Sequence, residues 1–234
     1  MCFSENQSYL NAVLLFFSGI YTLPNYRLSL AGVFFSLKEM IQGMMYRYKD
    51  NKKYMKILGI LSWLHICFQP LFINIFYSHF SLNFKYWNII FILSFVLGII
   101  MALELNELDI QNDDNCKPKS KNDDYCKETG GYIGKYHIGY TFHLDKEWKI
   151  IDYFKIWMLL FFIPVFFTKA RVLGLISLLL IVLIDIIYSY SSGVDLIIFT
   201  NDRIGEKSAI WCFLTIVFVP FILFEKRIKK MIKN

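Results

Sequence analysis

Long runs of apolar residues, interrupted by short charged connections, dominate the pattern along this chain. An apolar helix needs roughly 20 residues to cross the hydrocarbon core of a bilayer, and several of the runs approach that length. We therefore predict an all-α fold, a polytopic transmembrane helical bundle that forms a single membrane domain. The seven predicted spans cover residues 9–23, 28–46, 57–77, 86–103, 151–168, 172–190 and 209–224.

The connections between the runs do not give one clear orientation. The connector RYKDNKKYMK is basic, and so is the C-terminal tail EKRIKKMIKN, although the two are predicted on opposite sides of the membrane. Short basic connections normally stay cytoplasmic. The tail favours its own side as cytoplasmic, and the conflict leaves six or eight spans as alternatives to seven.

Composition supports a membrane protein. The chain is 56% hydrophobic and 18% aromatic, and its mean hydropathy of +0.43 exceeds what a water-soluble core of this length needs. The net charge of +6 comes from 25 basic residues against 19 acidic ones, and the basic residues stand beside the apolar runs. Such residues meet lipid phosphates, so we expect the lipid bilayer as partner and no nucleic acid.

The segment 104–150 is the one long polar stretch, and we predict that it lies outside the membrane. Its first half contains Cys116 and Cys126, which form a disulfide if this side is exoplasmic and stay reduced if it is cytosolic. In its second half, glycines punctuate an alternating pattern that predicts a small β-hairpin or flap on the membrane surface. This flap contains His137 and His143.

Ionisable residues inside apolar runs are costly and mark candidate sites. Glu39, His65 and Asp185 belong to three different predicted spans, and Gln69 follows His65 by one helical turn. With a rise of 1.5 Å per residue, all three ionisable groups are expected about 8 to 12 Å below the side that bears the flap. The sequence therefore predicts a polar pocket that opens to that face. The alternative is a structural network that joins helices.

A metal ion is a further hypothesis. Nitrogen and oxygen ligands suit zinc, so Glu39, His65 and Asp185 form a possible catalytic zinc site. Cys116 and Cys126 of the loop, taken with the flap residues His137 and His143, match no compact zinc spacing. Two simpler interactions are also expected. Pro70 removes the helical hydrogen bond to the carbonyl of Ile66, which His65 could then bind, and Lys38 either extends to the interface or pairs with Asp185.

Two family resemblances follow from these residues. The runs MCFSE, FFSLKEMIQ, WLHICFQPLFIN and GKYHIGYTF resemble motifs of an uncharacterised multi-span membrane protein family of giant DNA viruses and some microbes. That resemblance implies a host or viral membrane and no known activity. The span count and the Ser, acidic and His residues also resemble seven-span hydrolases of the alkaline ceramidase and progestin-receptor type. Those hydrolases have a His-x3-His pair in the last span, whereas AIWCFLTIVFVPFILF contains no histidine.

The sequence thus predicts a multi-pass integral membrane protein of unknown biochemical function, with a buried polar site at Glu39, His65, Gln69 and Asp185. One alternative is a membrane-embedded lipid-modifying hydrolase, with His65 as a base or metal ligand. Another is a small-solute or proton carrier that uses the same glutamate and histidine.

Overall fold

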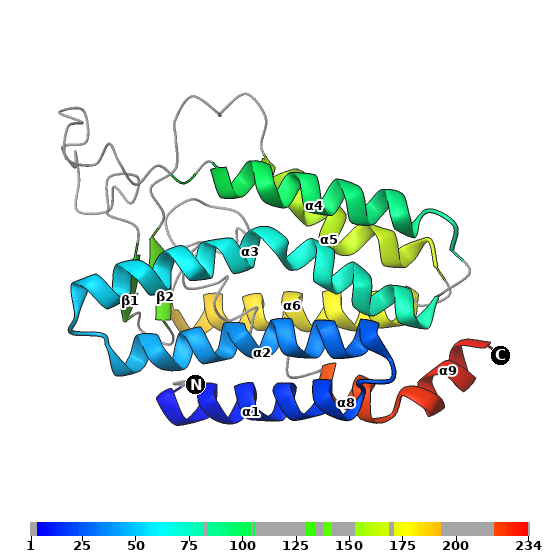
Figure 1. The fold of residues 1–234 in the computed structure, drawn as a ribbon, viewed down its shortest axis with the longest axis horizontal. Helices are drawn as coiled ribbons and strands as arrows, with labels where there is room; N and C mark the ends of the chain where they lie inside the picture. Colours follow the sequence, from blue (N-terminus) through cyan, green and yellow to red (C-terminus); the bar gives the residue numbers. More distant parts are fainter. Residues whose placement is uncertain are drawn as a thin grey trace.

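The computed structural model describes residues 4–81, 84–103, 105, 130–133, 138–141, 153–168, 171–192 and 218–233. Its helices lie side by side along one common direction, and the C-terminal helix turns away at one end (Figure 1). The helices are α1 (Glu5–Tyr21), α2 (Tyr26–Arg47), α3 (Lys52–Phe80), α4 (Trp87–Leu103), α5 (Tyr153–Phe166), α6 (Arg171–Ser192), α8 (Phe218–Leu223) and α9 (Glu225–Lys233).

The helical character predicted from the apolar runs is present. One described helix, the 29-residue α3, is long and apolar enough to cross a bilayer, and α4 is a shorter apolar helix. The predicted number of spans therefore stays a prediction. Most of the predicted last span, 209–224, lies outside the described residues, and α8 occupies its final part.

A two-stranded antiparallel hairpin lies where the alternating pattern predicts one. Strand β1 (Gly130–Ile133) pairs with β2 (Ile138–Thr141), with Ile133 opposite Ile138. Ile138 is fully buried in a cluster with Met45, Met55 and Trp157. The hairpin is thus anchored to the helices by an apolar side chain, at the end where α2 connects to α3 (Figure 1).

Helices α1 and α2 pack backbone against backbone. A Cβ atom added to Gly32 would lie 2.9 Å from the Cα of Gly19 and 3.3 Å from the carbonyl oxygen of Leu15. Contacts this short leave no room for a side chain at Gly32. Small residues that permit such an approach are the usual means of pairing helices in lipid.

Helix α3 is the hub of the bundle because polar side chains join it to three neighbours. The His65 imidazole bonds α2, and Trp63 Nε1 donates to the carbonyl of Met101 in the last turn of α4, at 3.0 Å. A carbonyl in a last helical turn has no helical donor of its own. The indole of Trp63 therefore fills a position that the end of α4 leaves open.

The contact between α3 and α5 rests on a proline in each helix. Proline has no backbone N–H, so Pro70 leaves the carbonyl of Ile66 without its helical donor, and Pro164 does the same to Leu160. Trp157 Nε1 of α5 donates to the carbonyl of Ile66 at 2.8 Å, and Asn74 Nδ2 of α3 donates to that of Leu160 at 2.8 Å. Each helix thus satisfies the carbonyl that the proline of the other has freed. His65 does not take the Ile66 carbonyl, because Trp157 occupies it.

Apolar side chains cover much of the outer surface, and the interior holds apolar and polar side chains together. Helix α4 contains no charged residue, and its large apolar side chains are exposed along its whole length, at Ile89, Ile92, Leu93, Phe95, Val96, Ile99 and Leu103. Exposed apolar side chains also follow the outer faces of α1 and α6. Beside two apolar clusters, the interior holds polar groups, among them Asn11, Lys38, Glu39, Gln42, Ser62, His65, Gln69 and Asn74.

Candidate functional site

Glu39 lies at the contact between α1 and α2, and its side chain is 2% exposed. Asn11 Nδ2 of α1 donates a hydrogen bond of 3.3 Å to Glu39 Oε2, and Gln7 Nε2 donates one of 3.0 Å to Asn11 Oδ1. Gln7 is only half-buried and belongs to the first turn of α1. A chain of hydrogen-bonded side chains, which we call the Gln7–Asn11 file, therefore leads from the N-terminal end of α1 to a carboxylate inside the bundle.

The second carboxylate oxygen of Glu39 is the one carboxylate atom among several buried side-chain atoms without a hydrogen-bond partner in the described part of the chain. Glu39 Oε1 is buried and has no hydrogen-bond partner among the residues that the structure describes. Lys38, the preceding residue, is also fully buried and lies close enough to act electrostatically on both Glu39 and His65. Two buried charged residues in one apolar helix are costly, and in membranes such residues mark sites of function.

His65 is held by hydrogen bonds at both ring nitrogens. Its Nε2 lies 2.9 Å from the carbonyl oxygen of Phe34, and its Nδ1 lies 3.4 Å from Gln69 Nε2. A carbonyl only accepts, so Nε2 carries the proton and Nδ1 accepts from the Gln69 amide. The ring also stacks on Phe34, which Phe72 covers from the other side, with centroid distances of 3.9 and 3.7 Å. His65 therefore has no open ring nitrogen in this arrangement.

Glu39 and His65 lie at different levels of the bundle. His65 packs against Phe34, five residues before Glu39 on α2, which corresponds to about 7.5 Å along a helix axis. The two side chains were expected at nearly equal depth. Helix α3 begins at Lys52 rather than near residue 57, and the helix pairing is set by the stacking of His65 and Phe72 on Phe34. The described contacts join Glu39 to Asn11 and His65 to Phe34 and Gln69, and the predicted common pocket stays a prediction.

Several predicted site residues lie beyond what the structure describes. Asp185 is part of α6, but its side chain is outside the described residues, as are His137, His143, Cys116 and Cys126 entirely. The pairing of Lys38 with Asp185, the disulfide and the histidine flap therefore stay predictions. Within the described part of the chain, no three His, Cys, Asp or Glu side chains gather where they could hold a metal ion. A zinc ion stays a hypothesis.

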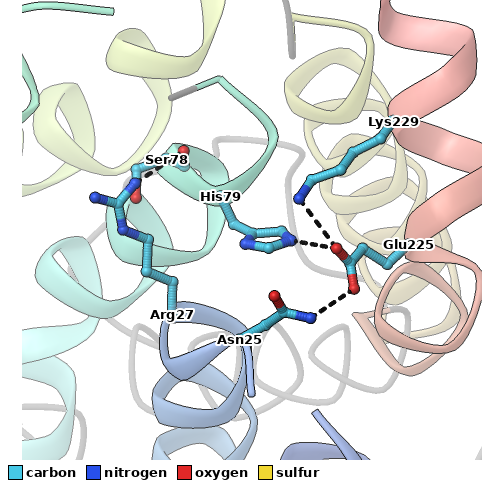
Figure 2. Close-up of polar contacts among 6 residues, drawn as sticks. All are labelled: Asn25, Arg27, Ser78, His79, Glu225 and Lys229. Carbon is cyan, nitrogen blue, oxygen red and sulfur yellow. Dashed lines mark hydrogen bonds and ion pairs between the residues drawn. The ribbon is translucent and has the colours of Figure 1, made fainter. Parts of the chain in front are cut away.

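A second polar cluster, which we call the end cluster, joins α9 to the turn between α1 and α2 and to the end of α3 (Figure 2). Glu225 of α9 is its centre. His79 Nε2 donates to Glu225 Oε1 at 2.8 Å, Lys229 Nζ lies 3.0 Å from the same oxygen, and Asn25 Nδ2 donates to Oε2 at 3.0 Å. Beside them, Arg27 Nη1 donates to the carbonyl of Ser78 at 3.3 Å. The cluster ties α9 to the α1–α2 turn and to the end of α3.

The charge of Glu225 is stabilised by these contacts. Burial opposes ionisation of its carboxyl group, but the hydrogen bonds from His79 and Lys229 outweigh burial and hold its pKa below the ordinary value of 4.5. Glu225 is therefore a carboxylate at neutral pH.

Sequence reasoning missed the end cluster. Asn25 and Glu225 are 200 positions apart in the chain, and the sequence around either residue does not indicate that the two are in contact. Two signals were present. Glu225 is the one acidic residue in the tail EKRIKKMIKN, and Asn25 precedes α2 without using its side chain as a helix cap. Both residues are explained by the bond between them.

A comparison with protein families matches residues 13–233, which is nearly the whole chain. The chain belongs to a family of unknown function, DUF5765. The match spans Glu39, His65 and the end cluster, while Asn11 precedes it. Searches of the curated proteins and of the solved structures matched nothing. The function of the family is unknown, so the resemblances to giant-virus membrane proteins and to seven-span hydrolases stay predictions.

Proposed function

We propose that this chain is a multi-pass integral membrane protein with a buried polar site at Lys38 and Glu39. One observation carries the proposal. The bundle turns uncharged apolar faces outward, most completely along α4, and encloses charged and amide side chains. Soluble monomers rarely expose continuous apolar surfaces of this kind, whereas a bilayer requires them. The length of α3 adds support.

A charge placed on the outer face of α4 tests this proposal. Ile92 is 61% exposed near the middle of the helix. In a bilayer, Ile92→Asp should cost about 3 kcal/mol and sharply reduce the amount of protein that resists alkaline carbonate extraction. In a water-soluble bundle the same substitution at an exposed position should be nearly neutral. Lys53→Asp, at an exposed position in the first turn of α3, is the matched control. Equal tolerance of both substitutions would contradict membrane insertion.

A second candidate, a small-solute or proton carrier, draws its support from the Glu39 site. The carboxylate has an oxygen without a described partner, and the Gln7–Asn11 file links it to the end of the bundle. Buried carboxylates of this kind serve as proton or ion relays in membrane transporters. The fully enclosed state of Glu39 then corresponds to a closed conformation.

Proteoliposomes with a pH indicator in the lumen test the carrier. Wild-type protein should dissipate an imposed pH gradient, Glu39→Gln should lose this flux while keeping the fold, and Asp50→Asn on the exposed connector should behave like wild type. Absence of wild-type flux at every pH would exclude a proton carrier.

The lipid-modifying hydrolase receives less support. A general base or a metal ligand needs an open nitrogen, and both His65 nitrogens are engaged with Phe34 and Gln69. Hydrolysis at His65 would require this contact to rearrange.

A further inference from the structure

Helix α9 presents two chemically different faces. Ile228 is 7% exposed and belongs to the apolar cluster formed by α1, α2 and α3, and Glu225 turns toward Asn25 and His79. Lys226 and Lys230, one helical turn apart, are exposed, and so is Arg227. The acidic group of the helix is thus directed inward while three cations are directed outward.

The end cluster fixes the position of this basic face. Hydrogen bonds from Asn25 and His79 to Glu225 hold α9 against the α1–α2 turn and the end of α3 (Figure 2). Lys229 pairs with Glu225 and balances its negative charge. The outward cations of α9 are therefore not needed for that purpose. Helix α9 therefore stays beside the bundle end, turned away from the helix layers (Figure 1).

The surroundings of α9 are those of a membrane interface. Exposed aromatic rings gather at this end, at Tyr21, Tyr26, Tyr86 and Phe224. Basic groups accompany them, with Lys85 Nζ 4.8 Å from the Tyr86 ring centroid and the Arg227 guanidinium 5.9 Å from that of Phe224. Aromatic rings settle at the headgroup level of a bilayer, and basic residues beside them attract anionic lipids.

We propose that the outward face of α9, formed by Lys226, Arg227 and Lys230, binds the anionic headgroups of the leaflet at this end of the bundle. The proposal rests on the membrane insertion proposed above and names the lipid partner. Charge complementarity selects the occupant, because five basic residues of α9 stand against one acidic residue that is already paired. In a cell, the leaflet rich in anionic lipids is the cytoplasmic one, so the proposal also orients the chain.

Energy transfer from the tryptophans to dansyl-labelled lipids in nanodiscs tests this proposal. Wild-type protein should prefer dansyl-phosphatidylserine over dansyl-phosphatidylcholine by about fivefold or more, since each basic residue at a headgroup surface contributes about that factor. The triple variant Lys226→Gln, Arg227→Gln, Lys230→Gln should lose this preference. The matched control, Lys49→Gln, Lys52→Gln, Lys53→Gln at the opposite end, should keep it.

Two further measurements separate the explanations. High salt should weaken the wild-type preference without any substitution, which keeps the proposal testable if the triple variant misfolds. Excess inorganic phosphate at matched ionic strength should not compete, and competition would indicate a site for free phosphate instead. Equal affinity of wild-type protein for both lipids, or equal loss in the control variant, would overturn the proposal. If the chain is not inserted at all, alkaline carbonate releases wild-type protein from vesicles, a result that the lipid preference does not affect.

Discussion

The contact between α3 and α5 and the site around Glu39 are both polar and buried. They differ in whether their polar side chains satisfy backbone groups that lack a helical hydrogen bond. At the α3–α5 contact, Trp157 and Asn74 donate to two carbonyls that Pro70 and Pro164 have freed. At the other site, Glu39 compensates no such deficit, and its Oε1 has no partner among the described residues. Each site holds a buried oxygen without a described partner, the amide Oδ1 of Asn74 at the first and the carboxylate Oε1 of Glu39 at the second, but the oxygen at the second belongs to an ionisable group and is therefore the more costly.

The difference teaches how to read polar residues in apolar helices. A buried donor that satisfies an orphaned carbonyl stabilises the bundle, and its presence needs no further role. A buried carboxylate that has one unpaired oxygen and lies beside a buried lysine is retained at a cost, which is typical of functional sites. The predictions below test this division between the two regions.

The largest effect is expected at Trp157. Trp157→Phe removes the donor to the carbonyl of Ile66 and should lower the free energy of unfolding by about 2 kcal/mol. In a Pro70→Ala background, the alanine N–H can restore the helical bond to Ile66, so the same substitution should cost clearly less. Unfolding in mixed micelles measures this coupling as a double-mutant cycle. Equal costs in both backgrounds would contradict the role assigned to Pro70.

A smaller effect is expected at the end cluster. Glu225→Gln removes the charge that His79 and Lys229 contact and should cost about 1 kcal/mol, because Glu225 is partly accessible to solvent. The pH dependence has a definite sign. The pKa of Glu225 is lowered by folding, so its contribution is complete above pH 4.5 and is lost as the pH falls below that value.

Comparison of wild type with Glu225→Gln across this pH range checks the sign. The two stability curves should converge on acidification below pH 4.5. A difference that persists or grows in acid would show that Glu225 contributes in some way other than through its charge.

The smallest change in stability is expected at Glu39. Glu39→Gln keeps an acceptor for Asn11 and removes a buried charge, so the free energy of unfolding should change by about 0.5 kcal/mol or less, or rise. Thermal unfolding of the purified variant measures this effect. A loss comparable to that of Trp157→Phe would place Glu39 among the structural residues and remove the distinction drawn above.

Much of the helix layout follows from the sequence, because apolar runs bounded by charged connectors define where helices begin and end. The predicted ranges 28–46 and 86–103 differ from α2 and α4 by at most two residues at either end. The end of α3 was less predictable. The helix continues through Ser78 and His79, and His79 bonds Glu225 of α9. The sequence around His79 gives no sign of this distant partner.

Only part of the candidate site follows from the sequence, because contacts between helices are not encoded locally. Glu39 and His65 are conspicuous as ionisable residues in apolar runs, but their partners are set by how the helices pack. The stacking of Phe34 between His65 and Phe72 fixes the level of α3 against α2, and no local pattern encodes that choice. Likewise, the two prolines indicate which carbonyls lose their helical hydrogen bond. The side chains that donate to these carbonyls are about 90 residues away in the chain and cannot be identified from the local sequence.

The central claim, that the bundle crosses a membrane with its two ends on opposite sides, is tested most directly by labelling the native lysines. Sealed vesicles are treated with a membrane-impermeant amine reagent, and modified peptides are identified by mass spectrometry before and after permeabilisation. The lysines at one end are Lys49, Lys52 and Lys53, and those at the other are Lys226 and Lys230. We predict that one set reacts in intact vesicles and the other only after permeabilisation. Equal reaction of both sets in intact vesicles would contradict the claim.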